Sequence, residues 1–197
     1  MQATWWIYGG AKAPPYGASL HHWGILYTVR IVVALSLIVG TGLIALDAQA
    51  VDAKLQAQLS QLFPAAAAFS PKGSDPPVYK AFAGGDNVIG YAFWTTELEP
   101  LERGFDGPIK ILVGMDLKGV LSGIIVAQHN EPYGNFSIDL PRFAAQFKNK
   151  SIRDPFKVGG DIDAISRATI TVTSASRAVR NSARRIARQI LTPPGAR

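Results

Sequence analysis

The longest apolar stretch of the chain lies near its N-terminus and predicts a helix that crosses a membrane. Residues 31–46 carry no charge, and residues 24–29 extend the stretch backwards past Arg30. About 20 predominantly apolar residues suffice to cross a bilayer core of roughly 30 Å. We therefore expect a transmembrane helix over residues 24–46, with Arg30 close enough to the membrane edge to reach the headgroups.

The charges on either side of this stretch predict its direction. Lys12 and Arg30 precede most of it, whereas Asp47 and Asp52 follow it. Positive flanks favour the cytoplasmic side, so we expect a cytoplasmic N-terminus. The expected location is the inner (cytoplasmic) membrane, as a single-pass protein whose C-terminal domain lies in the periplasm.

A cleavable signal peptide is the alternative interpretation of the same stretch. Ala48, Gln49 and Ala50 resemble a small-residue cleavage site after an apolar run. Residues 1–23, however, are rich in Gly, Pro and aromatic residues, unlike a short basic leader. We expect this cytoplasmic segment to need a partner or the membrane surface if it is to be ordered.

After the apolar stretch the pattern changes to short elements. Apolar residues at helical spacing between residues 51 and 63 predict an amphipathic helix, which Pro64 ends. Residues 64–77 show no periodicity and are typical of a connector. Helix and connector together make up residues 47–77.

Four strand-like segments follow in close succession, and two helices come after them. Strands first and then helices favour an α+β domain with one covered face of the sheet. The predicted fold class is α+β: one N-terminal transmembrane helix, then a domain at residues 78–192 with a mainly antiparallel sheet flanked by helices, and a tail at 193–197. The expected strands are residues 78–82, 88–95, 109–115 and 120–128, and the expected helices are residues 140–147 and 174–191.

Composition narrows the classes of function. The chain has no cysteine, which excludes disulfides, thiolate zinc sites, iron–sulfur clusters and cysteine nucleophiles. Its net charge of +6 comes from residues 151–197, which contain nine bases and three acids. An external location disfavours a nucleic-acid partner, so we expect this arginine-rich segment to meet acidic lipid headgroups or an acidic partner. We expect no metal site and no catalytic set of the chain's own.

The most informative motif is Asp-Ala-Ile-Ser-Arg-Ala-Thr, from Asp163 to Thr169. It resembles the flavinylation motif of the FMN-binding domain family, which occurs in NosR/NirI-type regulators and in the NqrC and RnfG subunits of ion-pumping redox complexes. The resemblance covers most of the domain, because further segments stand in the order seen in NosR-like domains: LFPAAAAF, DPPVYKAF, GYAFWTTEL, LVGMDL and HNEP. It implies FMN joined by a phosphoester bond to the hydroxyl of Thr169, and a flavin transferase of the ApbE type as a partner.

The resemblance also implies which residues surround the cofactor. In the motif these are Asp163, Ser166 and Ala168, and a helix beginning near Ser174 could offer amides to the phosphate. In the loop after the last strand they are His129, Glu131 and Tyr133. The chain departs from the family at Arg167, where the family has glycine. Glycine is common where a backbone turns tightly, so this departure puts loading with FMN in question.

Two functions of different classes remain open. The first is an electron-transfer module that holds FMN outside the cytoplasm as a component of a redox system. The second is a non-catalytic accessory subunit of a larger respiratory or photosynthetic membrane complex, which keeps the fold with or without flavin. We expect an electron-transfer flavoprotein or an accessory subunit rather than a self-sufficient enzyme, because a chain without cysteine lacks the iron–sulfur centres of the family's longer members.

Overall fold

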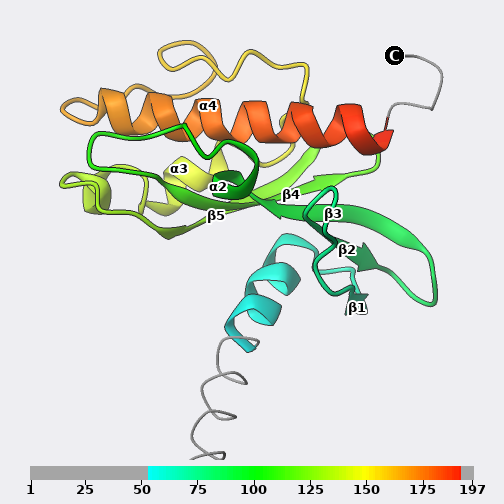
Figure 1. Ribbon diagram of the computed structural model, residues 1–197. Helices are drawn as coiled ribbons and strands as arrows, with labels where there is room; N and C mark the ends of the chain where they lie inside the picture. Colours follow the sequence, from blue (N-terminus) through cyan, green and yellow to red (C-terminus); the bar gives the residue numbers. More distant parts are fainter. Residues whose placement is uncertain (1–52, 192–197) are drawn as a thin grey trace, which may run out of the picture. The chain divides into compact units, whose positions relative to one another are not determined.

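The computed structural model describes residues 53–191, which form a five-stranded antiparallel sheet with helices on both sides (Figure 1). The strands lie in chain order from one edge to the other, each paired antiparallel with the next. They are β1 (Ala68–Phe69), β2 (Val78–Phe82), β3 (Val88–Trp94), β4 (Lys110–Asp116) and β5 (Leu121–Gln128).

The helical elements include one long helix and several short ones. Helical residues 53–62 precede the sheet. The last elements of the described residues are α4 (Thr169–Ile186) and the π-helical turn η2 (Ala187–Leu191). The short elements are α2 (Thr95–Leu98), η1 (Gly134–Phe136) and α3 (Pro141–Ala145).

Side chains alternate between two cores along the central strands. In β3, Phe93 faces the core shared with α4, whereas its neighbours Ala92 and Trp94 face the helix over residues 53–62. This period of two is what a strand buried on both faces requires. The apolar stripe of α4 includes Val172 and Val179, both fully buried against the sheet.

The strand predictions are confirmed to within two residues, and the domain is α+β as expected. The expectation of one covered face is wrong, because Leu59, Leu62 and Phe63 pack on the second face. The connector over residues 64–77 also contains β1, which pairs with the end of β2.

The predicted fold class needs a further correction, because it included a membrane span. No helix within residues 53–191 is both long and apolar enough to cross a membrane. The longest of them, α4, is amphipathic and carries four arginines. The stretch for which the span was predicted, residues 24–46, lies outside the described residues, as do residues 1–23 and the tail at 193–197.

The structure also corrects the predicted start of the last helix, α4. The helix begins at Thr169, five residues before the expected start at Ser174. Burial of Val172 against the sheet outweighs the low helix propensity of the β-branched residues in this first turn. Thr169 is therefore the first residue of the helix rather than part of a turn before it.

Candidate functional site

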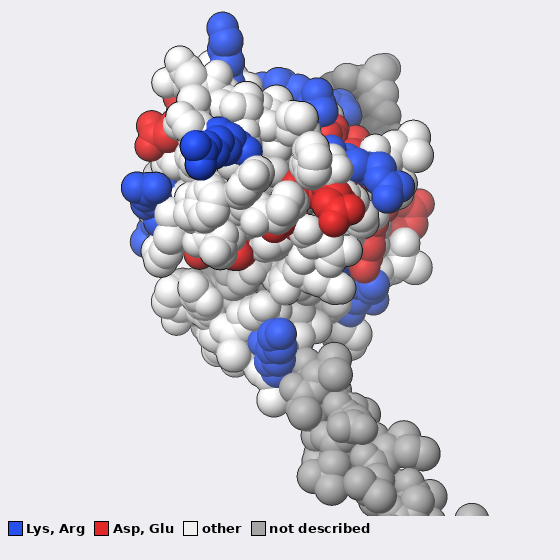
Figure 2. Space-filling view, turned by 90° about the vertical axis from the view of Figure 1, so that its left-hand side faces the viewer, with Lys and Arg blue, Asp and Glu red and all other residues white. Residues whose placement is uncertain are grey.

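A hollow of about 250 Å³ lies at the N-terminal end of α4. Thr169 and Ile170, both exposed, form its helical side, and Phe105 and Tyr133 from two separate loops also line it. Figure 2 looks onto this end of the domain, where uncharged side chains lie between scattered basic and acidic ones. The exposed fractions of Phe105, Ile170 and Tyr133 are 68%, 59% and 43%, so the hollow has an unusually apolar rim for a water-facing surface.

The first turn of α4 offers backbone amides to an anion. Its N-cap, Ala168, has no side chain that could accept a hydrogen bond. Within residues 53–191, no acceptor meets the amides of Thr169, Ile170 and Thr171. Unpaired amides at a helix N-terminus, together with the helix dipole, favour phosphate groups.

Arg167 stands directly before this turn in a left-handed backbone conformation, with φ of 67°. This region favours glycine, the residue that the family carries here. The side chain of Arg167 is exposed, lines the hollow and has no hydrogen-bond or ionic partner among the described residues. An exposed guanidinium therefore lines the same hollow as Thr169.

Glu131 fastens the loop that carries Phe105 to the first turn of α4. Its carboxylate is buried, and it accepts hydrogen bonds from the amides of Phe105 at 3.0 Å and Asp106 at 2.9 Å. It also accepts one from the hydroxyl of Thr171. Gly104 leaves room for this carboxylate, because a Cβ at that position would come within 2.3 Å of Oε1. Glu131 thus fixes the position of Phe105, which lines the hollow.

His129 orients the loop after β5, which carries Glu131, and it is not among the residues that line the hollow. Its Nδ1 accepts a hydrogen bond from the amide of Glu131 at 3.0 Å, so its Nε2 carries the proton and donates to Asp139 at 2.8 Å. Gly134 lies against the imidazole ring, since a Cβ there would come within 2.1 Å of Cε1.

The sequence-predicted site residues fall into three groups. Thr169, Ala168 and Tyr133 line the hollow, and His129 and Glu131 lie behind it, as described above. Asp163 and Ser166 line a different hollow, of about 430 Å³, in which the amide of Asp163 donates to Gln146 at 2.7 Å. Sequence reasoning missed Phe105 and Ile170; the only signal for Phe105 was an aromatic residue in a glycine-bounded loop.

A second set of hydrogen bonds holds the same loop, the one that carries Phe105, against α4. Arg177 donates two hydrogen bonds to the carboxylate of Glu102, each at 2.7 Å, and Ser174 donates a third at 3.1 Å. The hydrogen bonds and charge of Glu102 raise the pKa of Arg177 above its ordinary value. Loop residues on both sides of Phe105 are therefore attached to the helix that carries Thr169.

Residues 104–184, which include all residues that line the hollow, match the family model of the FMN-binding domain. Over these residues the chain is thus similar to FMN-binding domains. The chain is homologous to FMN-binding subunits of the RnfG and NqrC type. The finer resemblance to NosR-like domains stays a prediction.

Three relatives show how far the similarity extends. Each is the G subunit of an ion-translocating oxidoreductase complex. The chain is 35% identical to that of Haemophilus influenzae Rd over 111 residues, which is 51% of this chain and 50% of the relative. It is 33% identical to that of Methanosarcina acetivorans over 126 residues, which is 57% of this chain and 64% of the relative. It is 31% identical to that of Erwinia tasmaniensis over 120 residues, which is 56% of this chain and 53% of the relative. The chain thus spans between 50% and 64% of the length of these relatives.

Proposed function

We propose that this chain carries FMN on Thr169 and transfers electrons as a subunit of a membrane oxidoreductase complex. Its homologues are subunits of such a complex, and residues 104–184 match the FMN-binding domain. The observation that carries the proposal is the position of Thr169, exposed at the first helical residue of α4 and inside an apolar-rimmed hollow.

The residues at the hollow fit the chemistry of FMN. The unpaired amides of the first turn of α4 and the guanidinium of Arg167 suit a phosphate. Phe105, Tyr133 and Ile170 offer an apolar surface of the kind that a flavin ring requires. The hollow is smaller than the roughly 300–1,000 Å³ of most ligand pockets, so it would leave part of the ring open to a redox partner. When bound, FMN would supply one- and two-electron redox chemistry.

Among the threonines at the start of α4, Thr169 has the hydroxyl that a modifying enzyme can reach from the hollow. The hydroxyl of Thr171 is buried and donates to Glu131. Thr173 lines a separate hollow among arginines farther along α4. A flavin transferase of the ApbE type would therefore transfer the FMN phosphoryl group from a flavin dinucleotide to Oγ1 of Thr169. The phosphoanhydride bond of the donor breaks, the hydroxyl loses its proton and a nucleoside monophosphate leaves; this enzyme is the modifying partner that we propose.

The test is co-expression of the full chain with a flavin transferase, followed by in-gel fluorescence of the denatured protein and intact-mass measurement. We expect fluorescence and a mass increase of one FMN minus one water. Thr169→Ala should abolish both, whereas the matched control Thr173→Ala, on the same helix, should keep both. Fluorescence that survives Thr169→Ala would exclude this threonine as the attachment site.

An accessory subunit without flavin is the second candidate, and Arg167 favours it. This side chain lines the same hollow, where the family has only a glycine hydrogen. If the wild type gains no flavin in the co-expression test and Arg167→Gly gains it, Arg167 is what blocks loading. A location outside the cytoplasm stays a prediction, which a C-terminal alkaline phosphatase fusion would test.

A further inference from the structure

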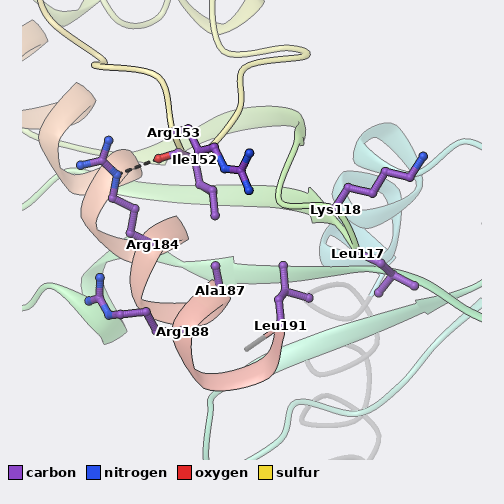
Figure 3. A pocket seen from close by; sticks show the side chains of 8 residues that line it. All are labelled: Leu117, Lys118, Ile152, Arg153, Arg184, Ala187, Arg188 and Leu191. Carbon is purple, nitrogen blue, oxygen red and sulfur yellow. Dashed lines mark hydrogen bonds between the residues drawn. The ribbon is translucent and has the colours of Figure 1, made fainter. Parts of the chain in front are cut away.

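A second hollow, of about 600 Å³, lies at the opposite end of α4. It is bordered by the β4–β5 turn, by residues 152–153 and by the last turns of the final helix (Figure 3). Arg184, the first residue of α4 that lines it, comes 15 residues after Thr169, which is about 22 Å along the helix at a rise of about 1.5 Å per residue. FMN attached at Thr169 would not occupy this hollow, because the two hollows share no lining residue.

Four cationic side chains and no carboxylate line this hollow, which we call the cationic groove: Lys118, Arg153, Arg184 and Arg188. Arg184 is fixed, because it donates to the carbonyls of Ile152 at 2.7 Å and Asp154 at 2.9 Å. Within residues 53–191, the side chains of Lys118, Arg153 and Arg188 have no hydrogen-bond or ionic partner. Three cations are thus available to an incoming anion.

The cationic groove also has an apolar part, formed by Leu117, Ile152, Ala187 and Leu191. Leu117 is 47% exposed, one of the few large apolar side chains on the surface of the described residues. Ala187 and Leu191 belong to the π-helical turn η2. Such turns are rare and are frequent at functional sites. An apolar centre with charged surroundings is the usual organisation of a protein–protein interface.

Further positively charged side chains lie along α4 beyond the cationic groove. Arg184 also lines the next hollow, of about 550 Å³, together with Lys157, Arg177 and Arg180. The two hollows therefore form one strip between α4 and residues 152–158. Since a planar headgroup layer would touch protruding side chains rather than enter a strip of hollows, this shape favours an extended polypeptide over a membrane surface.

We propose that the cationic groove binds an extended acidic segment of a partner protein, with one apolar side chain against Leu117 and Leu191. Carboxylates of that segment pair with Lys118, Arg153 and Arg188, and arginine favours such pairing because its planar fork can hold both carboxylate oxygens. The groove anchors the partner, and Thr169 at the other end of α4 stays open. This binding does not require that flavin be attached.

The test uses the full chain and a fluorescein-labelled peptide that alternates glutamates with a central leucine. Fluorescence anisotropy measures its binding to the wild type, and the same peptide with glutamine in place of glutamate is the ligand control. The groove variant is Lys118→Gln/Arg153→Gln/Arg188→Gln. Its matched control, Lys54→Gln/Arg103→Gln/Lys148→Gln, removes three exposed cations that make no side-chain hydrogen bond or ion pair within residues 53–191.

We expect the acidic peptide to bind the wild type and the control variant with similar affinity. The groove variant should raise the Kd by about tenfold or more, because three charge pairs are lost. Equal weakening by both variants would show a general effect of net charge and would overturn the proposal. So would failure of the peptide to bind while vesicles of three parts phosphatidylcholine to one part phosphatidylglycerol bind. Unchanged circular dichroism melting of both variants verifies that they are folded.

Discussion

The hydroxyl of Thr171, in the first turn of α4, donates a hydrogen bond to the buried carboxylate of Glu131 in the loop after β5. The same carboxylate holds the backbone at Phe105 and Asp106. One side chain thus joins three segments that are far apart in sequence around the hollow at Thr169. The position of the aromatic rim relative to the attachment threonine depends on this carboxylate.

Replacing Glu131 by glutamine should destabilise the domain. Glutamine keeps the size of the side chain but puts an NH₂ group where a carboxylate oxygen accepts hydrogen bonds. At least one of the three donors, the amides of Phe105 and Asp106 and the hydroxyl of Thr171, then loses its acceptor, which costs about 1–3 kcal/mol. Urea unfolding of Glu131→Gln at neutral pH measures the loss. The control is Glu97→Gln, whose partly exposed carboxylate pairs, among the described residues, only with Lys72 at 2.8 Å. This change should alter stability by less than about 1 kcal/mol.

Replacing Arg167 by glycine should stabilise the fold, because the residue has φ of 67°. A residue with a Cβ pays about 1–2 kcal/mol in this region, and the greater freedom of glycine in the unfolded chain offsets part of the gain. We therefore expect Arg167→Gly to add about 0.5–1 kcal/mol, measured by urea unfolding.

Arg167→Ala separates the backbone effect from the loss of the side chain. Alanine also carries a Cβ and should leave stability within about 0.5 kcal/mol of the wild type, because the exposed guanidinium has no partner among the described residues. If alanine stabilises as much as glycine does, the left-handed backbone is not the cause.

Asp161 should make stability depend on pH in the acidic range. Burial alone would raise its pKa, but the ammonium of Lys150 and the amides of Lys157 and Phe156 outweigh that effect and lower it below the ordinary 3.8. A lowered pKa in the folded state adds stability above the unfolded pKa, and this part is lost as pH falls through the folded value. Asp161→Asn should therefore be less stable than the wild type at neutral pH.

The difference between Asp161→Asn and the wild type should shrink as the pH falls below about 3.8. Thermal melts of both proteins across the acidic range measure it. Asp163→Asn is the matched control on the same segment, since no side-chain hydrogen bond of Asp163 lies within the described residues. A constant difference between Asp161→Asn and the wild type at every pH would contradict the charge explanation.

Much of the sheet could be predicted from local sequence. Residues 78–82 were predicted as a strand and coincide with β2, because alternating side chains and turn residues are local signals. The start of α4 could not be predicted in this way. Its first residues are β-branched, and only the packing of Val172 against the sheet makes them helical.

The site was predictable in part. The motif indicated Thr169, but nothing local could show that Phe105 lies beside it, since 64 residues separate them in the chain. Their proximity depends on Glu131, whose hydrogen bonds cross three segments. Closeness in sequence is an equally poor guide. Asp163 and Ser166 are near Thr169 in the chain, yet they line a different hollow.

Gly134 should be among the least replaceable residues behind the hollow. A Cβ there would lie 2.1 Å from Cε1 of His129 and 2.9 Å from its Nδ1. The imidazole would have to move, and it would lose its hydrogen bonds with the amide of Glu131 and with Asp139. Overpacking of this kind costs about 1–3 kcal/mol.

We therefore expect Gly134→Ala to lower the free energy of unfolding by about 1–3 kcal/mol and to speed amide exchange at Glu131 and Phe105. Gly84→Ala is the matched control, because a Cβ at Gly84 meets no atom within 4 Å among the described residues. Its stability should stay within about 0.5 kcal/mol of the wild type. Slow amide exchange at Phe105 in Gly134→Ala would show that Glu131 holds the loop without help from His129.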